Sequence, residues 1–373
     1  MSKVRLGDVA IEVRETSKNP EGLPVVGLEH LISGEITLTQ WSEASDNTFT
    51  KLFHKGQILF GRRRAYLKKA AVAPFDGVCS GDITVIAANP DKLLPDLLPF
   101  IISNDAFFDY AMEKSAGSLS PRVKWAQLAE YEFDLPELEK QQKLANLLWA
   151  MERTRKSYQD LLTQTDELVK SQFVEMFGDD SYPHRPLIDL IIPGAGLSYG
   201  IVQPGDEGTG DMGVLRPVDL VDGGIKTDDI KYVDRAIGES YKRTELQGDE
   251  ILITVRGTTG VTALTDPRFI GMNVTRGIAV IRYNPDMIMP EFLNAYLRSK
   301  SGQEYIQSHT QGTTLRQINM SDLRKMPIMI PPEKAQLRYI SFVDMTDKSK
   351  LAIRQALESL EKSRSAIMTK VFG

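Results

Sequence analysis

The polar side chains best suited to bind another molecule lie on short loops that occur twice along the chain. Residues 61–69 read Gly-Arg-Arg-Arg-Ala-Tyr-Leu-Lys-Lys and follow an apolar run, and residues 254–260 read Thr-Val-Arg-Gly-Thr-Thr-Gly at the equivalent place. An arginine can donate two hydrogen bonds to a guanine edge, while lysines, hydroxyls and backbone amides hold phosphates. These loops favour contact with nucleic acid, and ordinary polar surface turns are the alternative.

A second pair of loops, residues 116–124 and 311–319, offers a glycine, then hydroxyls, then an arginine beside a lysine or an amide. Because the same pattern occurs twice, a functional role is favoured over a surface turn. The candidate DNA contacts in the first half are Arg62, Arg63, Arg64, Tyr66, Lys68, Lys69, Ser118, Arg122 and Lys124. Those in the second half are Arg256, Thr258, Thr259, Arg276, Thr313, Thr314, Arg316 and Gln317.

Signatures of catalysis and of metal binding are missing from the sequence. The four histidines are scattered without metal-ligand spacing, Cys79 is the single cysteine, and no Gly-rich loop ends in Gly-Lys-Ser/Thr. Asn89-Pro90-Asp91-Lys92 departs at its third residue from the tetrapeptide expected of an amino-methyltransferase. We therefore expect no catalytic residue, no metal site and no cofactor bound by this chain.

Composition indicates a soluble globular protein. Of 373 residues, 42% are hydrophobic and 25% charged, and the N-terminus lacks the apolar core of a signal peptide. With no membrane-length apolar stretch and one cysteine, which we expect in the core, a cytoplasmic location is predicted. The net charge of −5 is unusual for a stand-alone nucleic-acid binder, but residues 47–75 contain no acidic residue and seven cationic ones.

The chain is a direct repeat. Ile83-Thr84-Val85-Ile86 matches Ile278-Ala279-Val280-Ile281, Pro136 matches Pro331, Gln141 matches Gln336, and Phe177-Gly178 matches Phe372-Gly373, every pair being 195 positions apart. Upstream the offset drifts, as insertions would cause. One unit spans about residues 3–178 and the other about 186–373, joined by a polar segment with two prolines.

Each repeat has two unlike parts. The first has short β-type runs and one expected helix (residues 95–110, and 290–306), which indicates a mixed α/β domain. The second, residues 138–177 and 333–372, has no glycine or proline and predicts a long helix. A heptad-like seam predicts that the two helices pair as an antiparallel coiled coil. Its candidate residues are Leu144, Leu148, Met151, Tyr158, Leu162 and Val169 in the first helix, and Ile353, Leu357, Leu360 and Ile367 in the second.

This order of elements resembles the specificity subunits of type I restriction-modification systems. The strongest local matches are Gly56-Gln57-Ile58-Leu59-Phe60, Gly312-Thr313-Thr314, and Ile330-Pro331-Pro332-Glu333 with Gln336. The first repeat departs from the pattern, because Leu135-Pro136-Glu137 lacks the second proline. The resemblance covers nearly the whole chain and places target recognition domains at residues 1–136 and 179–332, and spacer helices at 137–178 and 333–373.

The resemblance implies a subunit without catalysis of its own, in which each domain reads one half of a split double-stranded DNA target. The helices would act as a spacer and dock two modification subunits, which bind S-adenosylmethionine and methylate adenine. Restriction subunits would add an ATP- and Mg-dependent nuclease. Two alternatives remain open: a scaffold protein that binds other proteins through its coiled coil, and a nuclease or methyltransferase fused to a DNA reader.

Overall fold

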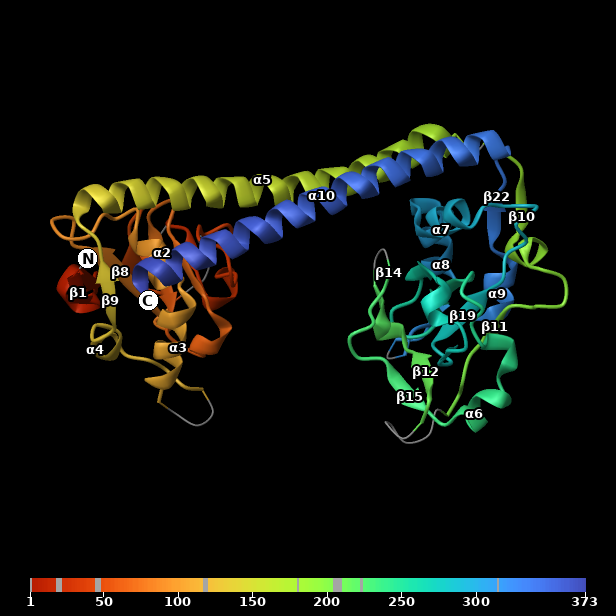
Figure 1. The fold of residues 1–373 in the computed structure, drawn as a ribbon, viewed down its shortest axis with the longest axis horizontal. Helices are drawn as coiled ribbons and strands as arrows, with labels where there is room; N and C mark the ends of the chain where they lie inside the picture. Colours follow the sequence, from red (N-terminus) through yellow and green to blue (C-terminus); the bar gives the residue numbers. More distant parts are fainter. Residues whose placement is uncertain are drawn as a thin grey trace. The chain divides into compact units, whose positions relative to one another are not determined.

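The computed structural model describes residues 2–17, 22–43, 48–116, 120–179, 181–203, 210–221, 224–313 and 315–373. The chain forms two compact units: unit 1 comprises residues 1–162 and 352–373, and unit 2 comprises residues 163–351. Each unit therefore contains one mixed α/β region and a segment of both long helices. The order of the elements can be followed by colour in Figure 1.

Unit 1 is built on two small sheets. The larger has the antiparallel order β2 (Ala10–Val13), β8 (Ile83–Ala88), β5 (Ile58–Gly61), β6 (Ala70–Val72). The smaller has the order β3 (Val25–Val26), β7 (Gly77–Cys79), β4 (Lys51–Phe53), and its β3–β7 pair is parallel. β1 (Ser2–Arg5) pairs with β9 (Glu132–Leu135), just before the first long helix.

Unit 2 repeats the topology of the larger sheet, which confirms the predicted duplication. This sheet has the order β11 (Ser198–Tyr199), β19 (Ile278–Ile281), β16 (Ile251–Thr254), β17 (Thr262–Leu264). The smaller sheet also has one parallel pair but a different arrangement, β15 (Lys231–Val233), β12 (Met212–Leu215), β18 (Asn273–Val274), with its first strand along the chain in the centre. β10 (His184–Pro186) pairs with β22 (Pro327–Met329), and the further pairs are β13 (Leu220–Val221) with β14 (Gly224–Ile225) and β20 (Thr310–Gln311) with β21 (Gln317–Ile318).

The helix expected after the central strand is divided in both units, so the single-helix prediction is wrong. Unit 1 has α2 (Leu98–Ile102) and α3 (Asp105–Glu113), and unit 2 has α7 (Pro290–Arg298) and α8 (Lys300–Ser308). Asn104 accepts a hydrogen bond from the Ala106 amide, and Ser299 accepts one from the Gly302 amide. Both are N-cap interactions, which begin a new helix in a new direction. The remaining short helices are α1 (Leu6–Val9), α4 (Trp125–Leu128), α6 (Arg235–Glu239) and α9 (Met320–Lys325).

The two long helices are confirmed as α5 (Leu138–Phe177) and α10 (Glu333–Phe372). One glutamine side chain attaches the first turn of each helix to its own domain. Gln141 accepts a hydrogen bond from the Leu94 amide at 2.9 Å and donates one to the Pro136 carbonyl at 2.9 Å. Gln336 likewise accepts one from the Met289 amide at 3.0 Å and donates one to the Pro331 carbonyl at 2.9 Å.

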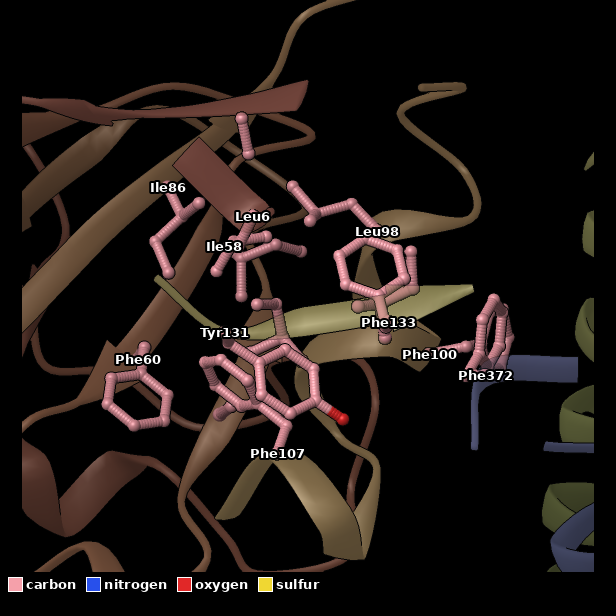
Figure 2. Close-up of a cluster of buried hydrophobic side chains, with 14 of the residues drawn as sticks. Leu6, Ile58, Phe60, Ile86, Leu98, Phe100, Phe107, Tyr131, Phe133 and Phe372 are labelled. Atoms are coloured by element: carbon pink, nitrogen blue, oxygen red, sulfur yellow. The ribbon is translucent and has the colours of Figure 1, made fainter. Parts of the chain in front are cut away.

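The end of each long helix completes a core that belongs mainly to the other repeat. In unit 1, Phe372 of α10 joins the core beside Phe133, as Figure 2 shows. The centroids of their rings are 6.4 Å apart. In unit 2, Phe177 of α5 joins the core beside Phe292, at 5.0 Å. The start of one helix therefore shares a unit with the end of the other, which confirms antiparallel pairing.

The predicted seam is buried to different degrees. Leu148 and Met151 are buried, and the other eight seam residues are partly buried: Leu144, Tyr158, Leu162, Val169, Ile353, Leu357, Leu360 and Ile367. In the part of the chain that the structure describes, no helix is both long enough and apolar enough to span a membrane.

A charged cluster that the apolar pattern did not predict lies in the same helix region of unit 1. Arg155 donates to Glu152 at 2.6 Å and to Glu35 at 3.2 Å, and Arg364 of α10 lies 3.7 Å from Glu152. The side chains of Arg155 and Glu152 are only 7% and 8% exposed. The hydrogen bond to Glu152 raises the pKa of Arg155, so this cation is fixed in the charged state.

Candidate nucleic-acid interface

In unit 1, three backbone hydrogen bonds bring the two predicted loops together. The Arg62 amide donates to the Asp82 carbonyl at 3.0 Å, and the Val123 amide donates to the Arg62 carbonyl at 3.0 Å. The Arg64 amide donates to the Pro121 carbonyl at 2.9 Å. The start of the 61–69 loop is thus held between the residue before β8 and the segment that precedes α4.

Unit 2 makes the same three bonds with different residues. The Val255 amide donates to the Gly277 carbonyl at 2.7 Å, the Ile318 amide to the Val255 carbonyl at 3.1 Å, and the Gly257 amide to the Arg316 carbonyl at 2.9 Å. Isolated β-bridges join Arg63 to Arg122 in unit 1 and Arg256 to Gln317 in unit 2. The equivalent positions are therefore Arg63 with Arg256, Arg122 with Gln317, and Asp82 with Gly277.

We call these three backbone hydrogen bonds, which join the two loops in each unit, the loop frame. In unit 1 a carboxylate lies at this frame. Asp82 accepts hydrogen bonds from Arg122 at 2.8 and 3.3 Å and from Arg63 at 3.5 Å, and Arg63 also donates to the Ser120 hydroxyl. The hydrogen bond from Arg122 holds the pKa of Asp82 below its usual range. Asp82 was not among the candidate residues. The sequence could have indicated Asp82 only by its position directly before the apolar run of β8, because the residue that precedes this strand bonds to the 61–69 loop.

The other unit 1 candidates differ in how freely they can reach a ligand. Lys68 forms an ion pair with Asp105, and Lys69 donates to the Leu28 carbonyl at 2.7 Å. Arg62 is half-buried, and its Nε has no hydrogen-bond partner among the described residues. Arg64, Tyr66 and Lys124 are exposed, whereas Ser118 lies outside the described residues.

Arg64 has a backbone conformation that L-residues rarely adopt. Its φ is 55°, in the left-handed region, and the equivalent residue in unit 2 is Gly257, with φ 75°. Glycine takes this conformation freely, while a residue with a Cβ is strained there by about 1–2 kcal/mol. The loop of unit 1 therefore keeps an arginine where glycine would be the less strained residue.

Unit 2 has an open pocket where unit 1 has the carboxylate. The pocket has a volume of about 260 Å³ and is lined by Arg256, Arg276, Gln317, Asn319, Tyr199 and Met320, among others. Arg256 is half-buried and Arg276 is exposed. Tyr199 and Asn319 were not predicted as contacts. Asn319 ends the 311–319 loop, whereas Tyr199 belongs to no repeated polar loop that would have marked it.

The remaining unit 2 candidates lie around this frame. Thr258 and Thr313 are exposed, and the exposed Arg316 donates to the Gln307 side chain at 2.7 Å. Thr259 is buried and shares a 3.0 Å hydrogen bond with the Thr310 hydroxyl, so its own hydroxyl is turned inward. Thr314 lies outside the described residues.

The structure adds two observations on other candidate chemistry. Within the described ranges, no group of three or more His, Cys, Asp or Glu side chains is placed to hold a metal ion. Cys79 is fully buried, as predicted for a core residue, and burial raises the pKa of its thiol to about 12.

Comparison with known proteins agrees with the architecture. A family model described as "Type I restriction modification DNA specificity domain" matches residues 1–164 and 208–362. The chain is 25% identical to the type I restriction enzyme EcoBI specificity subunit of Escherichia coli over 47% of its own length, a match that spans only 38% of that protein. It is 22% identical to the type I restriction enzyme MjaIX specificity subunit of Methanocaldococcus jannaschii, over 92% of this chain and 83% of that one.

Two solved structures share the fold across nearly the whole chain. A chain from work on "complex assembly" and "conformational transition of the type I R-M system" aligns with a TM-score of 0.62 and 20% identity, covering 99% of this chain and 97% of that one. The type I restriction-modification S subunit from M. genitalium aligns with a TM-score of 0.56 and 15% identity, covering 100% and 96%. With both domain matches and the duplicated fold in place, the chain belongs to the type I restriction-modification DNA specificity family.

Proposed function

We propose that this chain is the DNA specificity subunit of a type I restriction-modification complex, and that its two domains read different halves of one split target. The observation that carries the proposal is the loop frame that occurs in both units with the same backbone hydrogen bonds and different side chains. A constant backbone places side chains reproducibly, while sequence is read by those side chains at base edges.

The chain acts without catalysis of its own within that complex. Modification subunits supply S-adenosylmethionine-dependent adenine methylation, and restriction subunits supply the ATP- and Mg-dependent cleavage. The helix pair provides the docking surface for the modification subunits. The net charge of −5 fits this arrangement, because the partner subunits would carry part of the phosphate contact.

Independent reading by the two domains has a direct test. Residues 1–135 are exchanged for the equivalent segment of a relative, and the methylated motif is determined in cells that also contain the modification subunit. One half of the motif should change while the other half and the methylation itself remain. If both halves change together, the domains do not read independently; if no defined motif is methylated even by the original chain, the proposed function is wrong.

We also propose that the helices set the gap between the half-sites. Each has 40 residues, about 60 Å at 1.5 Å per residue. One heptad added to each helix preserves the seam and lengthens it by about 10 Å. The unspecified gap in the motif should then grow by about three base pairs. A folded, active variant with the original gap would show that the helices do not measure the DNA.

A further inference from the structure

The pocket of unit 2 has the chemistry of a base-reading site. Arg256 and Arg276 both line it, and neither side chain has a hydrogen-bond or ion-pair partner among the described residues. No acidic residue is found among the described residues that line it. Because guanidinium groups are always charged and only donate hydrogen bonds, two of them without a counter-ion can donate to the acceptors of a ligand.

The backbone holds both arginines in place, and the two differ in exposure. The residues beside Arg256 are fixed, because the Val255 amide bonds to Gly277 at 2.7 Å and the Gly257 amide bonds to Arg316 at 2.9 Å. The Arg276 amide itself donates to the Ile201 carbonyl at 2.8 Å. Arg256 is half-buried against the pocket, while Arg276 is exposed at its edge. A preorganised and partly desolvated arginine is suited to selective contact, and an exposed one to general attraction of phosphate.

The pocket also lacks the carboxylate that unit 1 has at the equivalent place, and the structure explains why. A Cβ at Gly277 would lie 2.4 Å from Cγ of Pro217, so no side chain fits there unless the Pro217 ring or Gly277 itself moves. The guanidinium of Arg256 is therefore left free by a steric constraint in its own domain. Apolar side chains such as Ile318 and Met320 complete the wall, which suits the plane and edge of a base better than a phosphate.

We infer that Arg256 reads a guanine in the half-site bound by unit 2, with Arg276 as a supporting cation. In the major groove guanine presents two acceptors, N7 and O6, whereas adenine presents one acceptor and one donor and cytosine presents a donor. Only guanine matches the two parallel donors of a guanidinium. This assignment rests on the proposed function, since it needs the domain to bind duplex DNA at a defined motif.

The test uses the complete complex and the motif read from methylated DNA. In duplexes carrying that motif, each guanine of the unit 2 half-site is replaced in turn by 7-deazaguanine, which removes the N7 acceptor. At one guanine we expect the replacement to weaken binding about 10- to 100-fold with the original chain. Arg256→Ala removes both hydrogen bonds and the charge, so the unmodified DNA should bind at least as weakly, and the 7-deaza replacement should have no further effect.

Two variants separate base reading from charge and from folding. Arg256→Lys keeps the charge but not the two-donor fork, so it should lose most of the discrimination. Arg268→Ala removes an exposed arginine that pairs with Asp266 away from the pocket, and should bind like the original chain. Each variant is first shown to unfold at the original temperature.

The inference is overturned if the unit 2 half-site contains no guanine, if no 7-deaza replacement weakens binding, or if Arg256→Ala keeps the sensitivity. A uniform loss of affinity with a shallower salt dependence would assign Arg256 to a phosphate instead. In all these cases the motif itself is still bound, so the proposed function stands. If the original complex binds no defined motif, the proposed function fails first, and this inference fails with it.

Discussion

The loop regions of the two units share a backbone and differ in charge. In unit 1, Asp82 accepts hydrogen bonds from Arg63 and Arg122, so the two cations share one negative charge and are held in one orientation. In unit 2, Gly277 replaces that aspartate, and Arg256 faces an open pocket. The difference teaches that the repeat fixes where side chains are placed, while a single residue just before the neighbouring strand decides whether they are available to a ligand.

The helix regions show a similar contrast. Arg155 of unit 1 and Lys350 of unit 2 are 195 positions apart, and each bonds to a carboxylate three residues before it. The partners of Arg155, Glu152 and Glu35, are 8% and 23% exposed, but Asp347 and Asp166, the partners of Lys350, are 57% and 54% exposed. The same repeat position therefore holds a buried ion cluster in one unit and a solvent-screened ion pair in the other.

The largest difference should appear when these two cations are removed. Arg155→Ala removes the closer of the two cations beside the buried Glu152 carboxylate. It should lower the free energy of unfolding by about 3–5 kcal/mol. Lys350→Ala should lower it by at most about 1 kcal/mol, since its partners are screened by solvent. Urea unfolding of both variants measures the two values. Replacing Arg155 and Glu152 together by Met and Leu should recover most of the loss; equal losses for the two alanine variants would remove the contrast.

A smaller effect is expected when the carboxylate of unit 1 is neutralised. Asp82→Asn releases Arg63 and Arg122, so binding to unrelated DNA should tighten and the slope of log affinity against log salt should steepen by about 1. The matched control is Asp266→Asn, which frees an arginine of unit 2 outside the pocket. An unchanged salt slope for Asp82→Asn would show that the two arginines do not reach DNA.

The same variant predicts a pH dependence of stability. The folded-state pKa of Asp82 is lowered by Arg122, so its contribution is present above the unfolded pKa of about 4 and is lost as the pH falls through the folded value. The original chain and Asp82→Asn should therefore differ in stability at neutral pH and converge below pH ~4. A constant difference between pH 7 and pH 3 would contradict the role of the ionised carboxylate.

Substitutions at the residue with positive φ in the loop, Arg64 in unit 1 and Gly257 in unit 2, should change stability in opposite directions. Arg64→Gly relieves backbone strain and should keep or raise stability by up to about 1 kcal/mol, while it weakens DNA binding through the lost cation. Gly257→Ala introduces strain at φ 75° and should cost about 1 kcal/mol. Thermal unfolding checks the signs. If Arg64→Gly destabilises the fold, the arginine side chain supports the loop and is not simply tolerated there.

The smallest expected effect is the difference between the urea midpoints at which unit 1 and unit 2 unfold. Cys79 is buried with a raised pKa, so a thiol reagent should not modify it until unit 1 opens. Val274 is buried at the equivalent position of unit 2, so Cys79→Val with Val274→Cys moves the probe to the other unit. Because each core contains the helix end of the other repeat, we expect both probes to react at the same urea midpoint. Two distinct midpoints would show that the units open independently.

Much of this architecture was predictable from the sequence, because the offset of 195 residues and the Gly- and Pro-free runs report directly on repeats and helices. The divided helices were not, since Asn104 and Ser299 interrupt an apolar pattern that continues across them. The role of Asp82 was missed because it lies far from Arg63 and Arg122 in sequence, and only strand pairing brings the three together. The candidate DNA contacts remain predictions, which the experiments above address.

The buried ion cluster also bears on which helices can pair at all. Arg364 of α10 lies 3.7 Å from Glu152, and 195 positions earlier α5 has Val169 instead. If α5 paired antiparallel with a second α5 from another copy, a valine would replace Arg364, and the carboxylates around Arg155 would lose one of their two cations. Such a pair would leave an excess of negative charge around the buried Glu152, which is costly. The difference between the two repeats at this position therefore favours pairing of α5 with α10 of the same chain over pairing of α5 with α5 of a second copy.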